Sequence, residues 1–350
     1  MAITAAPATA DARADLMRLL AAKWVPPVIG VLADLGVADQ LTAGPLSAGT
    51  LASRVGAHPG ALYRLLRAAV SVGVFTADDQ DRFGLNPVGE CLRSDAPGSL
   101  RPAAMMFGLE PFWVPYARVR HSVMTGEPAF DQVYGTSVYQ YLSGHPDQAS
   151  LFGAAAAGFH AQAIAQIADA HDFCSYGTVV DVGGGTGTLL AAILRRHPAV
   201  HGVLFDRPDV IGTARDTFAS GLADRVDLVA GDFFESVPSG DALVVKSCLH
   251  NFADDQATAM LRVIRRAMSD RDTLLVAETV IPAGNGPHYA KLDDVEMLVI
   301  AGGADRDEHQ YARLLAAGGF TVQHVIPCGD RFSLIQARPA SARGHPDRAV

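Results

Sequence analysis

The chain has 350 residues, a formal net charge of -9 and a hydrophobic content of 49%. A chain of this length and composition can bury a sizeable core and is predicted to form two domains or one large one. The acidic charge argues against a nucleic-acid partner, because a surface that binds phosphates is basic. The four cysteines lie far apart without a C-x-x-C pair, which argues against disulfides and zinc and fits a reducing compartment.

The start of the chain does not have the pattern of a signal peptide. The N-terminus lacks a charged segment followed by an apolar core, so no signal peptide is expected. No stretch approaches about 18 uninterrupted apolar residues, so no membrane span is expected. Residues 1–14 and 339–350 are predicted to be disordered tails. The protein is therefore predicted to be cytoplasmic.

Residues 15–100 are predicted to form a mostly helical domain. A first helix carries apolar residues on one face, and two prolines then break or kink it before a second apolar run at 28–35. The residues concerned are Leu16, Leu19, Leu20, Trp24, Pro26 and Pro27.

A helix-turn-helix pattern follows in the same domain. A short helix at 51–55 leads into a turn at 56–60 that is rich in glycine and proline. The next helix is lined by Leu62, Leu65, Leu66 and Ala69. Residues 73–75 and 82–85 then resemble the two-stranded wing of a winged helix.

A winged helix invites a DNA-binding interpretation. The second helix of the pattern does carry Arg64 and Arg67. The tip of the wing, however, carries Asp78, Asp79 and Asp81, which would face phosphates with like charge. We therefore favour a scaffold or dimerisation role for this element.

Residues 101–176 read as a helical segment rich in aromatic side chains that links the two domains. Most such side chains form core. Some are expected to line an apolar pocket for a flat substrate, and the candidates are Trp113, Phe152 and Phe159.

Residues 177–338 alternate between strand and helix patterns, which predicts an α/β domain around a largely parallel sheet. Seven strands are expected, at 178–182, 201–205, 226–230, 242–247, 273–279, 320–326 and 331–337. Helices are clearest at 188–196, 208–219, 254–268 and 307–317. In open sheets of this kind a ligand lies at the carboxyl ends of the strands.

The stretch TVVDVGGGTGTL at 178–189 combines a buried strand, a glycine turn and the start of a helix. A dinucleotide fingerprint would need glycine at Thr188, but the glycine is at 187. The pattern instead resembles motif I of the S-adenosylmethionine (SAM) methyltransferases, with Asp181, Gly183, Gly185 and Gly187 in its places. The alternative is a glycine loop that only turns the chain.

Polar residues follow the next strands at the same edge of the predicted sheet. Asp206 lies about 20 residues after the glycine turn, as expected of a carboxylate that binds ribose hydroxyls. Asp232 can accept from an adenine amine, and Phe233 can pack on the ring. Lys246 ends the fourth strand. Each alone has a structural alternative, since an aspartate at a strand end often caps a helix and a phenylalanine is usually core.

The blocks DVGGGTG, LFDRPDV, GDFF and KSCLHNF together resemble the plant-type small-molecule O-methyltransferases, whose bacterial members modify polyketides and phenazines. The resemblance covers about residues 15–338. It implies a Rossmann-like SAM-binding domain behind a winged-helix dimerisation domain, and hence a homodimer that acts on a small aromatic molecule. It also implies that SAM, and its product S-adenosylhomocysteine (SAH), contact Asp181, Gly183, Gly185, Asp206, Asp232, Phe233 and Lys246.

The same resemblance places a general base at His250. A phenol has a pKa of about 10 and is mostly un-ionised at neutral pH, so its attack on the methyl group requires loss of a proton. A histidine with an ordinary pKa near 6.5 can take that proton as attack occurs. The alternatives are a capped or surface histidine, and a transfer driven by proximity alone.

A histidine base requires a partner that orients its ring. Glu278 matches the first glutamate of the family, and the second acid is expected at Gln310, which cannot carry charge. Asn251 stands where the family often has aspartate. Both departures weaken support for an imidazolium, and Glu308 is a nearby alternative acid.

The segment 293–298 resembles the helix that faces the substrate in this family, and it supplies Asp294 and Met297, with Asn251, as further substrate-binding candidates. Adjacent carboxylates at 293 and 294 also invite a metal interpretation. Helix capping and a solvated face are the simpler explanation, and no metal is expected.

The sequence thus predicts a SAM-dependent O-methyltransferase that methylates a hydroxyl of an aromatic or polyketide-like natural product. The alternatives are a SAM-binding scaffold diverted to nitrogen or carbon acceptors or to a reaction without methylation, and a winged-helix DNA regulator.

Overall fold

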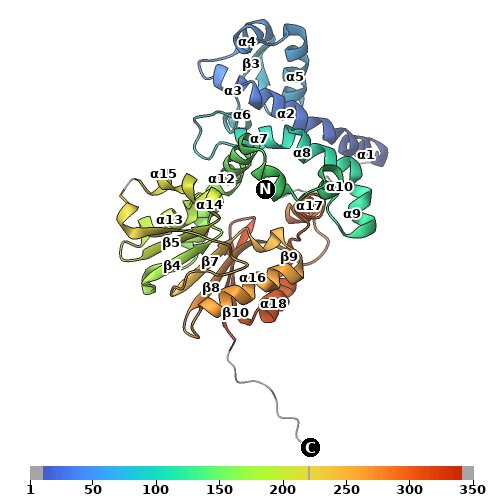
Figure 1. Cartoon of the computed structure of the whole chain (residues 1–350). Coiled ribbons are helices and arrows are strands. Elements are labelled where there is room, and N and C mark those ends of the chain that lie inside the picture. Colours follow the sequence, from blue (N-terminus) through green and yellow to red (C-terminus); the bar gives the residue numbers. More distant parts are fainter. Residues whose placement is uncertain (1–10, 220, 341–350) are drawn as a thin grey trace, which may run out of the picture. The chain divides into compact units, whose positions relative to one another are not determined.

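The computed structural model describes residues 11–219 and 221–340 and divides into two compact units (Figure 1). The N-terminal unit contains residues 11–124 and 129–161, and the C-terminal unit contains residues 125–128 and 162–340. The segment 101–176, which was predicted as a linker, is therefore divided between the two.

The N-terminal unit is mostly helical. Its helices are α1 (Ala12–Ala21), η1 (Ala22–Trp24), α2 (Val25–Asp34), α3 (Val37–Gln40), α4 (Ala48–Val55), α5 (Pro59–Ser71), α6 (Pro87–Glu90), α7 (Arg101–Gly108), α8 (Glu110–Trp113), η2 (Val114–Arg118), α9 (Val119–Thr125), α10 (Ala129–Tyr134), α11 (Val138–Ser143) and α12 (Pro146–Asp169), whose last turns belong to the C-terminal unit. A small antiparallel sheet has the order β1-β3-β2, with β1 (Leu46–Ser47), β2 (Thr76–Ala77) and β3 (Arg82–Gly84).

The predicted helix-turn-helix is present as α4 and α5. Helix α4 ends at Gly56 in the left-handed conformation, and the His58 side chain accepts a hydrogen bond from the Ala61 amide at the start of α5. The wing differs from the prediction, because Val74 and Phe75 are buried in the core and the strand β2 begins only at Thr76.

The start of the chain also differs from the prediction. The Asp11 side chain accepts hydrogen bonds from the Arg13 and Ala14 amides, so α1 begins at Ala12, within the predicted tail. At the other end β11 extends to Pro339. The remainder of both predicted tails, residues 1–10 and 341–350, lies outside the described residues.

The C-terminal unit is built on a mixed sheet with the order β10-β11-β8-β7-β4-β5-β6, and a short strand β9 pairs with β8. The strands are β4 (Thr178–Val182), β5 (His201–Asp206), β6 (Val226–Ala230), β7 (Ala242–Lys246), β8 (Thr273–Ile281), β9 (Arg306–Asp307), β10 (Phe320–Cys328) and β11 (Phe332–Pro339). The seven predicted strands are all present, and β9 is the one that was not predicted. Strands β10 and β11 run antiparallel, whereas β4 to β8 are parallel.

Helices cover both faces of this sheet (Figure 1). The helices of the described C-terminal unit are η3 (Phe173–Ser175), α13 (Thr188–Arg196), α14 (Pro208–Ile211), η4 (Gly212–Ala214), α15 (Arg215–Phe218), η5 (Ala223–Arg225), η6 (Leu249–Asn251), α16 (Asp254–Ala267), α17 (Ala290–Glu296), the π-helix η7 (Met297–Ala301) and α18 (Glu308–Ala317). The single helix predicted at 208–219 is divided into α14, η4 and α15.

Two hydrophobic cores lie on opposite faces because successive strand residues point to opposite sides. On β4, Val179 packs into the core under α13, whereas Val180 and Val182 pack into the core under α16 and α18. A sheet that is buried on both faces leaves its strand ends as the place where polar groups can meet a ligand.

Two stretches of the described chain, Ala12–Asp34 and Pro146–Asp169, are long and apolar enough to cross a membrane by length and composition alone. The criterion is weak, because helices of water-soluble proteins also meet it. The absence of a membrane span stays a prediction.

Candidate functional site

The glycine loop that follows β4 lies beside the end of β5. The Gly185 amide donates a hydrogen bond to Asp206 Oδ2 (2.8 Å), and the Arg207 amide donates to Asp206 Oδ1 (2.7 Å). Gly185 has a φ of +60°, and a Cβ built on it would meet no atom within 4 Å. The backbone here is therefore strained for any other residue and borders open space, as a loop that lies against a ligand must.

Burial shifts the ionisation of the charged groups behind this loop. Asp181 is buried, and neither carboxylate oxygen has a hydrogen-bond partner among the described residues. Burial raises the pKa of Asp181 to about 7 although Lys246 attracts its charged form. Burial lowers the pKa of Lys246 and raises that of Asp206, whose two amide donors oppose the change.

The third predicted strand end contributes one aromatic ring and one carboxylate. A Cβ built on Gly183 would lie 3.5 Å from Phe233 Cε1, so this ring borders the glycine loop. Phe233 also packs edge-on against Phe252. Asp232 is exposed and uses Oδ1 to accept from the Phe234 amide (2.8 Å).

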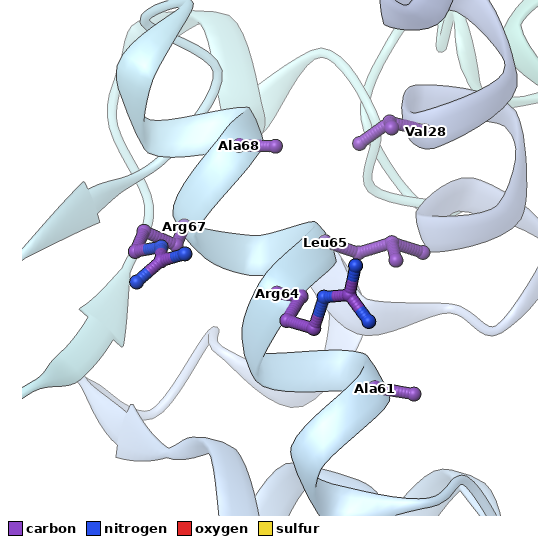
Figure 2. A pocket seen from close by; sticks show the side chains of 6 residues that line it. All are labelled: Val28, Ala61, Arg64, Leu65, Arg67 and Ala68. Atoms are coloured by element: carbon purple, nitrogen blue, oxygen red, sulfur yellow. The ribbon is translucent and has the colours of Figure 1, made fainter.

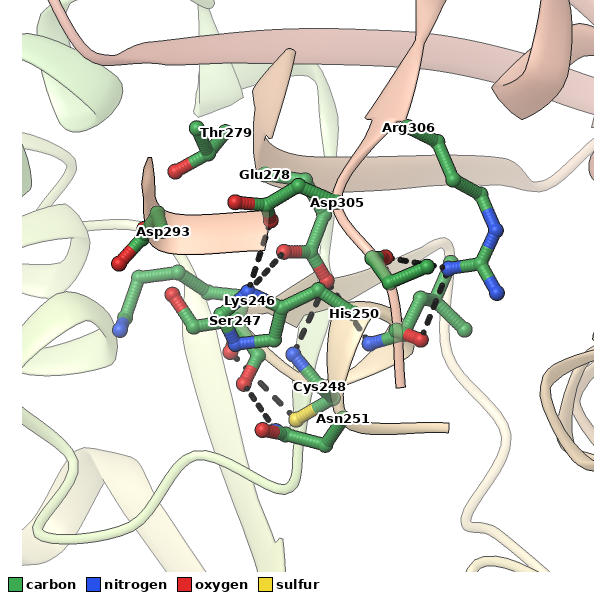
Figure 3. Close-up of polar contacts among 12 residues, drawn as sticks. Lys246, Ser247, Cys248, His250, Asn251, Glu278, Thr279, Asp293, Asp305 and Arg306 are labelled. Atoms are coloured by element: carbon green, nitrogen blue, oxygen red, sulfur yellow. Dashed lines mark hydrogen bonds and ion pairs between the residues drawn. The ribbon is translucent and has the colours of Figure 1, made fainter. Parts of the chain in front are cut away.

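His250 lies in η6, directly after β7, and faces two carboxylates (Figure 3). Its Nδ1 is 3.2 Å from Asp305 Oδ1 and 3.8 Å from Glu278 Oε2. The two acidic side chains are fully buried and that of His250 is 14% exposed. Because Nδ1 is directed at the carboxylates, the neutral ring carries its proton there, and Nε2 is left as the basic nitrogen.

Glu278 also fixes the backbone that presents His250. Its Oε1 accepts hydrogen bonds from the Cys248 amide (3.0 Å) and the Leu249 amide (2.8 Å), while Oε2 faces the imidazole. One carboxylate therefore sets both the position of the loop and the electrostatic field at the ring.

These contacts change the acidity of the histidine. Burial disfavours the imidazolium, but the charges of Glu278 and Asp305 outweigh burial and raise the pKa of His250 above its usual value. Burial raises the pKa of both Glu278 and Asp305, although the attraction of His250 opposes the change.

The acid beside His250 is Asp305 and not the predicted Gln310. Gln310 is exposed, and its side chain accepts from the Asp307 amide in the capping box that starts α18. Glu308, the considered alternative, is also exposed. A glycine pair precedes Asp305, and Gly302 has a φ of +78°, so the sequence indicates a turn here but not that the Asp305 side chain faces His250.

Two other candidates on the substrate side support this arrangement indirectly. Asp294 Oδ1 accepts from the Asp305 amide (3.0 Å), and Asn251 Nδ2 donates to the Ser247 carbonyl (3.0 Å). Met297 is half-buried at the start of η7. Asp293, considered as a metal ligand, pairs with Arg331 (3.1 Å).

Ser247 was not predicted from the sequence. It has a φ of +53°, and its buried Oγ has no hydrogen-bond partner among the described residues. Strained backbone and unsatisfied polar atoms concentrate at functional sites. Serine carries no sequence signal for this conformation.

The aromatic candidates belong to the N-terminal unit. Phe152 stacks on Phe112 with ring centroids 6.0 Å apart, Phe159 packs on Phe107 at 5.5 Å, and Trp113 is 38% exposed. Their role in substrate binding stays a prediction.

Comparison with known proteins identifies the class. Residues 116–321, more than half of the chain, match the O-methyltransferase domain family, and residues 17–95 match the O-methyltransferase dimerisation domain. The chain therefore belongs to the O-methyltransferase family, which confirms the predicted family. It is a SAM-dependent methyltransferase with a dimerisation domain and a Rossmann-like fold.

Individual relatives differ in the atom that accepts the methyl group, as their names state. The chain is 40% identical to the phenazine O-methyltransferase PhzM of Lysobacter antibioticus, over 93% of this chain and 95% of that one. It is 35% identical to the 8-amino-8-demethylriboflavin N,N-dimethyltransferase of Streptomyces davaonensis, over 89% and 91%. The crystal structure of the O-methyltransferase NcsB1 with SAM and 2-hydroxy-5-methyl naphthoic acid matches with a TM-score of 0.78 and 33% identity, over 90% and 96%.

We predict that Asp206 binds the ribose of SAM and SAH. Replacing Asp206 by alanine leaves ribose hydroxyls unpaired and should weaken SAH binding by about 1–3 kcal/mol. Isothermal titration calorimetry measures this directly. The control is Asp209→Ala, which removes an exposed carboxylate on the same segment that pairs with Arg207. Equal affinity of Asp206→Ala and wild type would remove Asp206 from the site.

Proposed function

We propose that this enzyme transfers the methyl group of SAM to a hydroxyl of a small aromatic natural product and that His250 is the general base. The observation that carries the proposal is the orientation of His250: its Nδ1 lies 3.2 Å from the buried Asp305 carboxylate and 3.8 Å from the buried Glu278 carboxylate, which leaves Nε2 to act as the base. Cys248, two residues earlier, places its Sγ 3.6 Å from the Gly183 carbonyl, which joins this loop to the glycine loop.

The residues at the strand ends fit SAM. Gly185 borders open space, the Asp206 carboxylate is held against the glycine loop by the Gly185 amide, and the Phe233 ring borders the same loop. The buried, unsatisfied carboxylate of Asp181 suits the cationic part of the cofactor. When bound, SAM supplies an electrophilic methyl group on a sulfonium.

The chain's own residues then provide the acid–base chemistry. His250 Nε2 accepts the proton of the acceptor hydroxyl, and the imidazolium that forms is stabilised by Asp305 and Glu278. The proton on Nδ1 stays between the ring and the Asp305 carboxylate. The amides of Cys248 and Leu249 keep Glu278 in place during this change of charge.

An oxygen acceptor suits this site better than a nitrogen acceptor. A relative does methylate an aromatic amine, by its name. A neutral amine, however, attacks with a lone pair that is already available, so it does not need a base raised in pKa by two buried carboxylates. A phenol does need one, and relatives act on phenazine and naphthoate hydroxyls by their names.

We further propose a homodimer formed through the N-terminal unit. Helix α1 and η1 expose five large apolar side chains: Leu16, Met17, Leu19, Leu20 and Trp24. They fall in or next to the segment that matches the dimerisation family.

A hollow of about 400 Å³ between α2 and α5 on the same unit is lined by Val28, Ala61, Arg64, Leu65, Arg67 and Ala68 (Figure 2).

We also propose that the binding partner is a small molecule and not DNA, and that the enzyme works in the cytoplasm. The wing has no free cation to offer DNA at Arg82, because that side chain pairs with Asp78. The wide spacing of the four cysteines along the chain favours a reducing compartment.

Removing the base should slow catalysis without loss of cofactor. We expect His250→Ala to lower kcat by about 10²- to 10⁴-fold, the usual share of general-base catalysis, with SAH affinity nearly unchanged. The measurement is turnover of a phenol identified by screening with labelled SAM. The control is Gln310→Ala, which removes a helix cap and should keep kcat. Retention of more than about a third of wild-type kcat by His250→Ala would contradict the proposal.

Turnover should also depend on pH through His250. Only the neutral ring accepts a proton, so kcat/KM should fall as pH drops, with a midpoint above the ordinary value of about 6.5 because the pKa is raised. In Asp305→Asn one stabilising charge is lost and the midpoint should move to lower pH. The pH profile of kcat/KM measures both, and an identical midpoint in the two proteins would exclude Asp305 as a partner of the base.

The dimer is tested by mass. Light scattering should give about twice 36.8 kDa for the wild type. Leu19→Glu should shift the protein toward monomer, because it places a charge in the proposed interface. Val123→Glu on α9 changes an equally exposed apolar residue outside the matched segment and should leave the mass unchanged. A monomeric wild type at micromolar concentration would rule out the proposal.

A further inference from the structure

Arg306, the first residue of β9, connects the two loops that carry His250 and Asp305. Its side chain is buried, with 3% exposure; it donates four hydrogen bonds, and one terminal nitrogen also lies within ion-pair distance of Asp254. The acceptors are Leu249 O (3.1 Å), Ala304 O (3.0 Å), Phe252 O (2.8 Å) and Asp254 Oδ1 (2.9 Å from Nε and 2.8 Å from the terminal nitrogen).

These acceptors lie on both sides of the catalytic pair. Leu249 and Phe252 flank His250 in the chain, whereas Ala304 directly precedes Asp305. Figure 3 shows Arg306, His250 and Asp305. One planar guanidinium therefore holds the histidine loop and the aspartate loop together, a task that suits its fork of fixed donors.

The two loops also touch through their backbones. The Ala304 amide donates to the His250 carbonyl (2.9 Å). A Cβ built on Gly303 would lie only 1.9 Å from the same carbonyl oxygen, so no side chain fits between the loops. The separation of His250 and Asp305 is thus set by contacts in the backbone and by Arg306.

We propose that Arg306 is a positioning residue that fixes the geometry of the His250–Asp305 pair. The role rests on the proposed function of His250 as base. In this proposal Arg306 contacts neither the cofactor nor the acceptor. Its effect passes through the carbonyls of Leu249, Phe252 and Ala304.

The charged groups around His250 determine how the basicity of its ring changes if the contacts of Arg306 with the two loops are lost. Glu278 approaches from β8, Asp305 from the loop before β9, and Asp293 from α17, where it is paired with Arg331. If the two loops separate, Asp305 retreats while Glu278 stays bound to the amides of the histidine loop. The imidazolium loses its closest partner, and the ring should become less basic.

The test uses Arg306→Lys, which keeps the charge but offers one ammonium that cannot span both loops. Arg306→Gln, which keeps two N–H donors, is the second variant. The matched control is Arg265→Lys at the far end of α16, because Arg265 also joins a carbonyl, that of Met268, to a carboxylate, that of Asp270. Asp254→Asn removes only the charge of the exposed carboxylate that pairs with Arg306.

The direct readout is the titration of the His250 ring by NMR in SAH-saturated protein, assigned by comparison with His250→Gln. We expect its midpoint to fall by about half a unit or more in Arg306→Lys and Arg306→Gln. It should not move in Arg265→Lys and should move little in Asp254→Asn. With a phenol substrate, kcat should fall about 10- to 100-fold in Arg306→Lys, as for a displaced catalytic group, while SAH affinity is kept.

The outcomes separate this proposal from the one on which it rests. An unchanged His250 midpoint in Arg306→Lys, or a loss of turnover that only follows the loss of folded protein, would overturn the positioning role. Absence of turnover by the wild type with every phenol would instead overturn the proposed function. The NMR titration would still test the positioning role of Arg306.

Discussion

The site depends on one arrangement, in which a single imidazole nitrogen faces two carboxylates that are buried in the protein. Buried charges are unfavourable unless other groups satisfy them. The structure meets this requirement in part: the Cys248 and Leu249 amides donate to Glu278 Oε1, and His250 Nδ1 lies 3.2 Å from Asp305 Oδ1. The second oxygen of each carboxylate is buried without a hydrogen-bond partner among the described residues. The same burial that makes the carboxylates costly makes their effect on the histidine strong, because little water screens them.

The parallel sheet explains why these groups meet. The glycine loop follows β4, Asp206 ends β5, His250 follows β7 and Glu278 lies near the end of β8, so all reach the same edge. Asp305 arrives from outside this pattern, by a loop that leads into β9, and it needs separate contacts to hold it. Asp294 supplies one at the Asp305 amide, and Arg306 supplies others through the neighbouring carbonyls.

The sequence predicted what depends on local pattern. The strand at 178–182 was predicted with the observed bounds because β-branched residues run directly into glycines, and the glycine loop followed from the same signal. The second acid was misplaced at Gln310, since an irregular loop has no period and only its packing against His250 reveals that Asp305 faces the ring. Ser247 and Arg306 were missed because neither residue type gives a local signal for the backbone conformation of the first or the buried contacts of the second. The pocket aromatics of the N-terminal unit stay predictions.

The central claim, that His250 removes the acceptor proton, is tested most directly by a series of phenols of decreasing pKa, each measured with wild type and His250→Ala at one pH. If the histidine acts as base, the ratio of the two kcat/KM values should be largest for weakly acidic phenols. It should approach one for phenols with a pKa well below the assay pH, which arrive already ionised. A ratio that stays constant across the series would contradict the account and show that His250 only positions the acceptor.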